Sequence, residues 1–174
     1  MKQTSDGFTL VEVLIVIIIT GVIASIAAPG WLAFINRQRI RTVRDEMLQI
    51  VQSAQSDAQR TNRSYTVAID STTGHATLTV GPVGQPGTPY SLGSDSVKQK
   101  LKLDATVPTL TFEPSGQVSS SGANPPFVIS ARLDNHNNSG SSDPSRCVVV
   151  TTLLGGLATG EDQDCTSPNY VPVP

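Results

Sequence analysis

The order of apolar and polar residues divides the chain into two parts. Residues 8–35 are predominantly apolar, and between Leu10 and Ala28 the only ionisable side chain is that of Glu12. At 1.5 Å per residue, the 19 residues of this run form a helix of about 29 Å, close to the thickness of the hydrocarbon core of a bilayer. A chain of 174 residues is too small to bury a helix that is apolar on all sides. We therefore expect residues 8–35 to cross a membrane once.

Beyond this run, apolar residues continue at helical spacing with charged and amide side chains between them. This apolar stripe consists of Ile40, Val43, Met47, Ile50, Val51, Ala54 and Ala58. The pattern predicts one helix of about fifty residues, membrane-spanning in its first half and amphipathic over residues 36–63. Pro29 removes one backbone hydrogen bond, so we expect a kink there.

After Arg63 the pattern changes to short apolar or alternating runs separated by loops rich in Gly, Pro, Ser and Asn. The lysines that alternate with apolar residues in one of these runs are typical of an edge strand. We expect strands over residues 64–69, 76–80, 97–103, 110–112, 127–133 and 147–154, and a loop over residues 81–89. A long helix whose apolar stripe is covered by an antiparallel sheet is an α+β fold, with the β domain occupying residues 64–174.

Composition and motifs exclude several functional classes. With 12 basic and 14 acidic residues, the net charge of −2 provides no overall field that would attract nucleic acid or an anionic surface. The sequence contains neither a G-x-S-x-G nucleophile elbow nor a glycine-rich phosphate-binding loop. His75 and His136 lie in predicted turns, where a histidine is usually solvated. We do not expect an enzyme or a bound cofactor.

Two acidic segments have the oxygen-rich composition of calcium loops. Residues 134–140 place their glycine one position later than an EF-hand loop does, and no closing glutamate follows. Glu161, Asp162 and Asp164 form the second segment. Solvated loops explain both segments more simply, so we expect no metal site, and calcium binding stays open as an alternative.

The orientation in the membrane has two opposing signals. Four arginines lie between Arg37 and Arg44, whereas only Lys2 and the amino terminus precede the apolar run, and the positive-inside rule would then place the large domain in the cytoplasm. Cys147 and Cys165 are the only cysteines, and such a pair is typical of one disulfide in an oxidising compartment. These residues alone leave the orientation open.

A resemblance at the amino terminus decides the orientation. The segment GFTLVE, residues 7–12, resembles the class III signal of type IV pilins and type II secretion pseudopilins. The resemblance implies that a prepilin peptidase cuts after Gly7 and methylates the new amino terminus at Phe8, so that residues 1–7 are a leader peptide. It also implies an inner-membrane protein with a cytoplasmic amino terminus and an extracytoplasmic domain, and a helix loosened at Gly21 and Pro29.

Glu12 occupies the position of the glutamate that this family carries five residues into the mature chain. A carboxylate one turn into a membrane-spanning helix costs about 2.5–3.5 kcal/mol on insertion, so a partner is expected. Cleavage after Gly7 creates an amine on Phe8 at about the same depth. In a staggered filament, the carboxylate of one subunit can pair with the amine of a neighbour, which relieves both desolvation penalties. We therefore expect Glu12 to act in assembly.

The rest of the chain resembles the H-type pseudopilin and FimT-like minor pilin branch of this superfamily. The residues that carry the resemblance are 54–60, 65–67, 110–116, 148–151 and the pair Gly155-Gly156. The resemblance implies a minor pilin or pseudopilin whose partners are prepilin peptidase, other pilins or pseudopilins, the inner-membrane assembly platform and membrane lipid.

The alternative function is a DNA-binding minor pilin that acts in DNA uptake. Several FimT-like members carry a Gly-Arg-x-Arg run after the late strand, but the corresponding residues here, 156–159, read GLAT and contain no arginine. Nucleic acid is therefore not an expected partner. The sequence does not distinguish a type II secretion system from a type IV pilus.

Overall fold

The computed structural model describes residues 8–70, 76–98, 100–120, 123–133 and 144–166. It divides into two compact units, Met1–Asn36 and Arg37–Pro174, which are described separately. All buried side chains that the structure describes belong to the second unit. Residues 37–174 therefore contain a complete hydrophobic core of their own.

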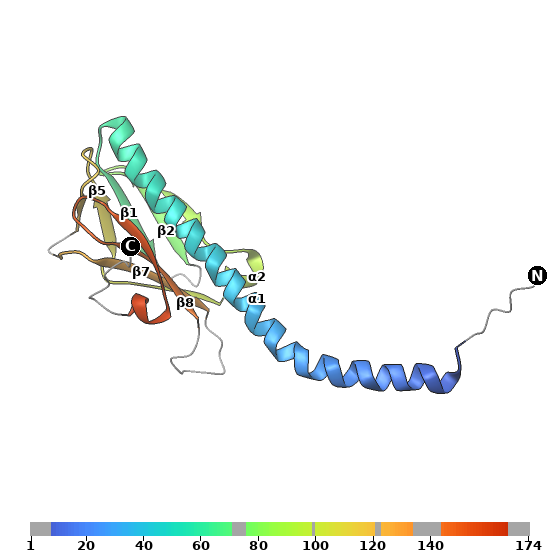
Figure 1. The fold of residues 1–174 in the computed structure, drawn as a ribbon. Helices are drawn as coiled ribbons and strands as arrows, with labels where there is room; N and C mark the ends of the chain where they lie inside the picture. The colour runs from blue at the N-terminus through green and yellow to red at the C-terminus, as the bar shows by residue number, and fades with distance from the viewer. Residues whose placement is uncertain (1–7, 71–75, 99, 121–122, 134–143, 167–174) are drawn as a thin grey trace, which may run out of the picture. The chain divides into compact units, whose positions relative to one another are not determined.

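Helix α1 (Leu10–Thr61) is one continuous helix of 52 residues, as the sequence predicts (Figure 1). In the second unit, six of the seven residues of the predicted apolar stripe are at most 1% exposed, and Ile50 is half-buried. The helix ends where Asn62 takes a left-handed conformation, with φ of 53°. The amide of Arg63 then donates to the carbonyl of Ala58 at 3.2 Å, which satisfies one of the free carbonyls at the helix end.

The first sheet has five antiparallel strands in the order β3-β2-β1-β5-β6. Their bounds are β1 Tyr65–Asp70, β2 Thr77–Pro82, β3 Thr88–Ser91, β5 Thr109–Phe112 and β6 Val118–Ser119. All four residues of β3 are exposed, and this strand forms one edge of the sheet.

The second sheet has four antiparallel strands in the order β4-β7-β8-β9. Their bounds are β4 Leu101–Ala105, β7 Phe127–Leu133, β8 Ser145–Val150 and β9 Leu157–Glu161. The short helix α2 (Asp95–Lys98) precedes β4, and the 3-10 helix η1 (Asp162–Cys165) follows β9.

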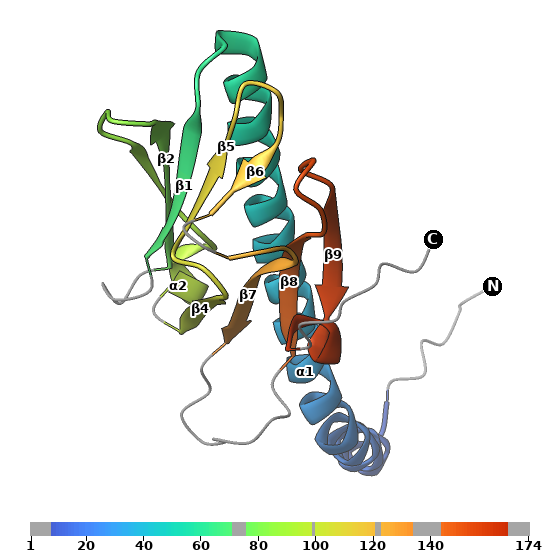
Figure 2. The same cartoon turned by 90° about the vertical axis from the view of Figure 1, so that its left-hand side faces the viewer.

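Both sheets pack their apolar faces on residues 40–58 of α1, which lies behind the strands in Figure 2. One core cluster joins the helix stripe to Val67, Leu78, Leu110 and Phe112 of the first sheet and to Phe127, Ile129, Val148 and Val150 of the second. Complete burial of each such side chain contributes about 1.5–3 kcal/mol. The predicted α+β fold is confirmed, but the expectation of a single sheet is wrong: the strands form two sheets on one helix.

Two further predictions require correction. The strand predicted over residues 97–103 begins only at Leu101, because the carbonyl of Ser94 accepts hydrogen bonds from the amides of Val97 and Lys98 at 2.8 and 3.0 Å and so starts α2. The predicted edge position is correct, because β4 is the outer strand of its sheet.

The loop predicted over residues 81–89 is shorter than expected. Strand β2 continues to Pro82 and β3 begins at Thr88, so these two strands form a hairpin. Gly81 and Gly87 make this possible: a Cβ added to Gly81 would lie 2.6 Å from the Cα of Gly87. Two residues without a Cβ allow the two backbones to approach this closely.

Candidate functional site

Helix α1 begins with a capped turn. Thr9 precedes the first helical residue, and its Oγ1 accepts a hydrogen bond from the amide of Glu12 at 3.3 Å. The Thr9 carbonyl accepts from the amides of Glu12 and Val13 at 3.1 and 3.3 Å. The predicted site residues do not include Thr9, although a Thr-x-x-Glu spacing is a known signal of a helix start. This cap places Glu12 in the first turn, where the helix dipole favours a carboxylate.

The predicted processing and assembly residues lie at this end of the chain. Phe8 is 82% exposed and precedes α1, whereas Gly7 lies outside the described residues. The Glu12 side chain is exposed. Within the parts of the chain that the structure describes, no side chain pairs with the Glu12 carboxylate.

The first half of α1 presents apolar side chains in all directions. The large apolar residues described between Leu10 and Ile26 are 48–80% exposed. The two hydroxyl groups in this stretch donate to the helix backbone: Thr20 to the carbonyl of Val16 at 2.7 Å, and Ser25 to that of Val22 at 2.7 Å. These hydroxyl groups therefore need no solvent partner.

No helix in the described part of the chain meets both the length and the hydropathy required of a membrane-crossing segment.

The predicted kink residues lie within the helix. Helical structure continues through Gly21 and Pro29. A Cβ added to Gly21 would meet no atom within 4 Å. Loosening of α1 at these two positions stays a prediction.

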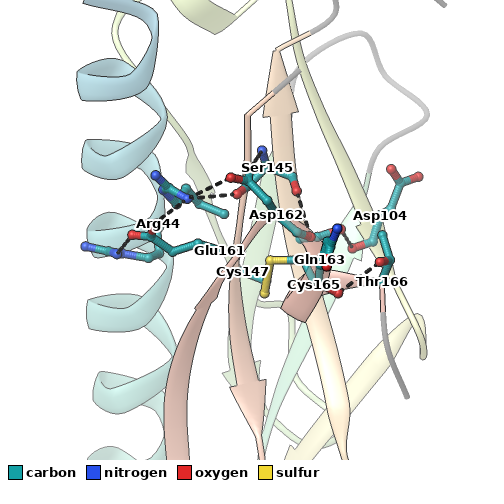
Figure 3. The surroundings of a disulfide bond; sticks show 11 residues. Arg44, Asp104, Ser145, Cys147, Glu161, Asp162, Gln163, Cys165 and Thr166 are labelled. Carbon is teal, nitrogen blue, oxygen red and sulfur yellow. Dashed lines mark hydrogen bonds and ion pairs between the residues drawn. A yellow bond between two sulfur atoms is a disulfide. The ribbon is translucent and has the colours of Figure 1, made fainter. Parts of the chain in front are cut away.

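The predicted disulfide between Cys147 and Cys165 is confirmed, and it joins β8 to η1 (Figure 3). Cys147 is fully buried and Cys165 is 8% exposed. With Val128 and Val149 they form a second, smaller apolar cluster. Because neighbouring side chains of a strand point to opposite faces, this cluster lies on the face of the second sheet that is turned away from α1.

An ion cluster lies beside the disulfide. Arg146 is 3% exposed, and its Nη1 lies 3.0 Å from Oε2 of Glu161 and 3.8 Å from Oδ2 of Asp162. Nη1 of Arg44, on α1, lies 3.8 Å from Oε1 of Glu161 (Figure 3). Oδ1 of Asp162 accepts a hydrogen bond from the amide of Ser145 at 2.9 Å. Two of the three carboxylates considered for calcium thus face arginines of the same chain.

The remaining candidate metal ligands do not form a metal site within the described residues. The segment 134–140, His75 and His136 lie outside these residues. Among the described side chains, no group of three or more His, Cys, Asp or Glu has the arrangement that a metal ion requires.

A surface groove of about 450 Å³ lies between α1 and the β2–β3 hairpin. Its lining includes Glu46 and Asp57 of the helix and Tyr90 of β3. Both carboxylates have partners within the chain: Glu46 accepts from the amide of Gly93 at 2.7 Å, and Asp57 pairs with Arg60 at 3.0 Å. No histidine or cysteine lines the groove.

Comparison with known proteins gives one sequence match and several structural ones. The family described as "Prokaryotic N-terminal methylation motif" matches residues 2–28. No curated protein is significantly similar in sequence. The type IV minor pilin FimU of Pseudomonas aeruginosa is similar in structure, with 16% identity, 75% of this chain and 94% of FimU covered, and a TM-score of 0.51. The minor pseudopilin EpsH of the Vibrio cholerae type 2 secretion system is 17% identical, with coverage of 70% and 96% and a TM-score of 0.50.

The sequence match and the structural matches give different kinds of information. At these identities the structural likeness establishes the fold, a long helix packed on antiparallel strands. The methylation motif covers the amino-terminal segment that contains Phe8 and Glu12. This chain thus combines a prokaryotic N-terminal methylation motif with a fold similar to that of a minor pilin and of a minor pseudopilin.

Proposed function

We propose that this chain is a minor pilin or minor pseudopilin, a non-enzymatic subunit of a type IV pilus or a type II secretion pseudopilus. The observation that carries the proposal is the combination of a methylation motif at residues 2–28 with the fold found in a minor pilin and a minor pseudopilin.

Processing is the first step of the proposed function. Prepilin peptidase removes residues 1–7 by cutting after Gly7, and the new amino terminus on Phe8 is methylated. Helix α1 begins at Leu10, so the cleavage point precedes the helix and Thr9 can cap it after the leader has left.

Anchoring and assembly follow from the exposed apolar surface of α1. Residues 8–35 hold the precursor in the inner membrane with the amino terminus in the cytoplasm, residues 36–63 continue the helix, and residues 64–174 form the extracytoplasmic domain. The disulfide supports an oxidising compartment for that domain. Exposed apolar surface of this extent requires a partner. Lipid provides it before assembly; other pilins or pseudopilins, inserted with the help of the inner-membrane platform, provide it afterwards.

Glu12 guides insertion into the filament. Its carboxylate has no partner among the described residues of its own chain, which supports pairing with the amine on Phe8 of a neighbouring subunit. No observation favours the DNA-uptake alternative, since residues 156–159 at the start of β9 contain no arginine.

The test is co-expression of the full chain with a prepilin peptidase, followed by mass spectrometry of the intact product. The expected product starts at N-methyl-Phe8, and Gly7→Ala slows its formation, whereas Gly21→Ala, the same change within α1, leaves cleavage unaffected. A product that keeps Met1, or one cut near Ala28, would contradict the proposal. Capture of the mature chain by minor pilins or by minor pseudopilins of the same cell then identifies the assembly.

A further inference from the structure

Trp31 and Phe34 form an aromatic pair on α1. Their ring centroids are 6.0 Å apart with planes tilted by 33°. Residues three apart lie on the same side of a helix, and the two side chains are 65% and 58% exposed. Trp31 is the only tryptophan of the chain. The first unit of the structure thus presents one broad aromatic surface to its surroundings.

The pair lies where the chain changes from apolar to basic. The run from Leu10 to Ala28 precedes it, and the exposed Arg37, Arg39 and Arg41 follow it. Tryptophan is enriched at membrane–water interfaces, because the ring is apolar while its N–H seeks a polar partner. Arginines just outside such a ring extend toward lipid headgroups. This order of residues matches the outer boundary of a bilayer.

Apolar content alone does not determine the depth of this helix in a membrane. The 26 helical residues from Leu10 to Ile35 have a length of about 39 Å, whereas a hydrocarbon core is about 30 Å thick. A segment longer than the bilayer can tilt or slide. A residue with a strong preference for the interface is needed to select one position.

We propose that Trp31 and Phe34 anchor α1 at the outer membrane–water interface and thereby set the depth of Glu12 and of the cleavage point; this rests on the proposed membrane anchoring. The 19 residue steps from Glu12 to Trp31 correspond to about 29 Å of helix. An indole ring held at the outer interface therefore puts Glu12 at the opposite edge of the hydrocarbon core. There its carboxylate lies at the boundary with the headgroups, where the amine of a neighbouring subunit can reach it, and the bond after Gly7 lies on the cytoplasmic side, accessible to the peptidase.

The single tryptophan makes the depth directly measurable. The full chain is reconstituted into vesicles of phosphatidylethanolamine and phosphatidylglycerol that carry bromine at either a shallow or a deep acyl position. We expect shallow bromines to quench the fluorescence of Trp31 more strongly than deep ones. In the matched variant W31F/F34W the reporter moves outward by about 4.5 Å, and the preference for shallow bromines increases.

Flotation of the vesicles tests membrane anchoring separately from the interfacial position of Trp31 and Phe34. If the chain does not float with the vesicles, membrane anchoring itself fails. If it floats and deep bromines quench best, Trp31 is not at the interface. That result refutes the interfacial role of Trp31 and Phe34 but leaves the membrane anchoring of the chain intact. If it floats and neither bromine quenches, the ring lies outside the bilayer or is covered by protein, and either result overturns the anchor.

A second readout concerns the cleavage point. The variant W31L/F34L keeps the apolar length of α1 and removes the interfacial preference, so we expect a several-fold loss of cleavage rate by prepilin peptidase in vesicles. W31Y, which retains a ring with a polar end, restores the rate, and Ile23→Leu within the apolar run leaves it unchanged. An unchanged rate in W31L/F34L would refute the role of the pair in positioning Gly7.

Discussion

Glu161 lies directly opposite Arg146 in the ladder between β9 and β8, and its Oε2 is 3.0 Å from Nη1 of Arg146. The arginine side chain is 4% exposed, whereas that of Glu161 is 51% exposed. Nε of Arg146 is buried and has no hydrogen-bond partner among the described atoms. The two partners therefore differ in what they lose when the pair is broken. Removal of the Glu161 carboxylate leaves the Arg146 charge buried without its nearest anion, which is costly.

The first prediction is that Glu161→Gln lowers the free energy of unfolding of residues 37–174 by about 1–3 kcal/mol, because Arg146 keeps only Asp162, at 3.8 Å, as an anionic neighbour. Urea unfolding of the oxidised protein measures the loss. Asp95→Asn is the matched control, since Asp95 pairs with Lys98 on the surface and its side chain is 98% exposed. Equal stability of Glu161→Gln and wild type would show that Asp162 alone compensates the arginine.

The second prediction concerns the disulfide. Its loss in Cys165→Ser lowers the free energy of unfolding by about 3 kcal/mol, because the bridge closes a loop between residues separated by 18 positions. The melting temperature of residues 37–174, measured with and without reductant, tests this, and reductant should leave a C147S/C165S variant unchanged. Alkylation of both thiols in the native, non-reduced protein would show that the bridge is absent.

The third prediction links these two sites. The disulfide holds η1, and η1 carries Asp162, whose Oδ1 accepts from the amide of Ser145. Without the disulfide, η1 is no longer held against β8, so Asp162 is no longer held close to Arg146. The losses from Cys165→Ser and Glu161→Gln should therefore sum to more than the loss in the double variant. Strict additivity in a double-mutant cycle would show that the two sites are independent.

The fourth prediction concerns Gln55, which joins α1 to a turn of each sheet. Its Nε2 donates to the carbonyls of Gly116, between β5 and β6, and Gly155, between β8 and β9, both at 3.1 Å. Gln55→Ala should cost about 1–2 kcal/mol, and Gln55→Glu should cost more, because a carboxylate oxygen would face two carbonyl oxygens. Gln52→Ala, on the exposed side of the same helix, is the control for urea unfolding. A Gln55→Glu variant as stable as wild type would exclude this bridging role.

The fifth prediction addresses assembly. Glu12→Ala and Glu12→Gln should both be cleaved and inserted into the membrane, yet be recovered poorly with sheared filaments beside wild-type subunits. Glu12→Asp, which keeps the charge, should retain part of the incorporation. The ratio of mature chain in filaments to mature chain in membranes measures this effect. Normal incorporation of Glu12→Gln would refute the charge-pairing mechanism.

Features encoded by neighbouring residues were predictable from the sequence. The buried side of α1 follows a period of 3.6 residues, and positions such as Met47 and Val51 are fully buried as expected. The strand over residues 127–133 matches β7 residue for residue, because its apolar run is bounded by two prolines on one side and a polar segment on the other. The GFTLVE segment likewise indicated the methylation motif that matches residues 2–28, because its pattern is contained in six consecutive residues.

Other strands depended on contacts made only in the folded chain. Strand β3 contains Pro89 and has no buried residue, so its own sequence gives little strand signal, and it forms by pairing with β2. Strand β6 has two residues and exists through the pairing of Phe112 with Val118. Strand β9 contains Gly160, which weakens strand propensity, and it is held by its pairing with β8.

The sequence by itself determined the long helix with its buried stripe, the amino-terminal methylation motif and the presence of one possible cysteine pair. Only the tertiary structure decided that the strands divide into two sheets, that Arg146 is buried against Glu161, and that Gln55 bridges turns 61 and 100 residues away. The physical reason is the range of the interactions. A helix period or a methylation motif is recognised within a few neighbouring residues. Sheet order and buried ion pairs instead result from contacts between segments that are far apart along the chain, and no local pattern encodes them.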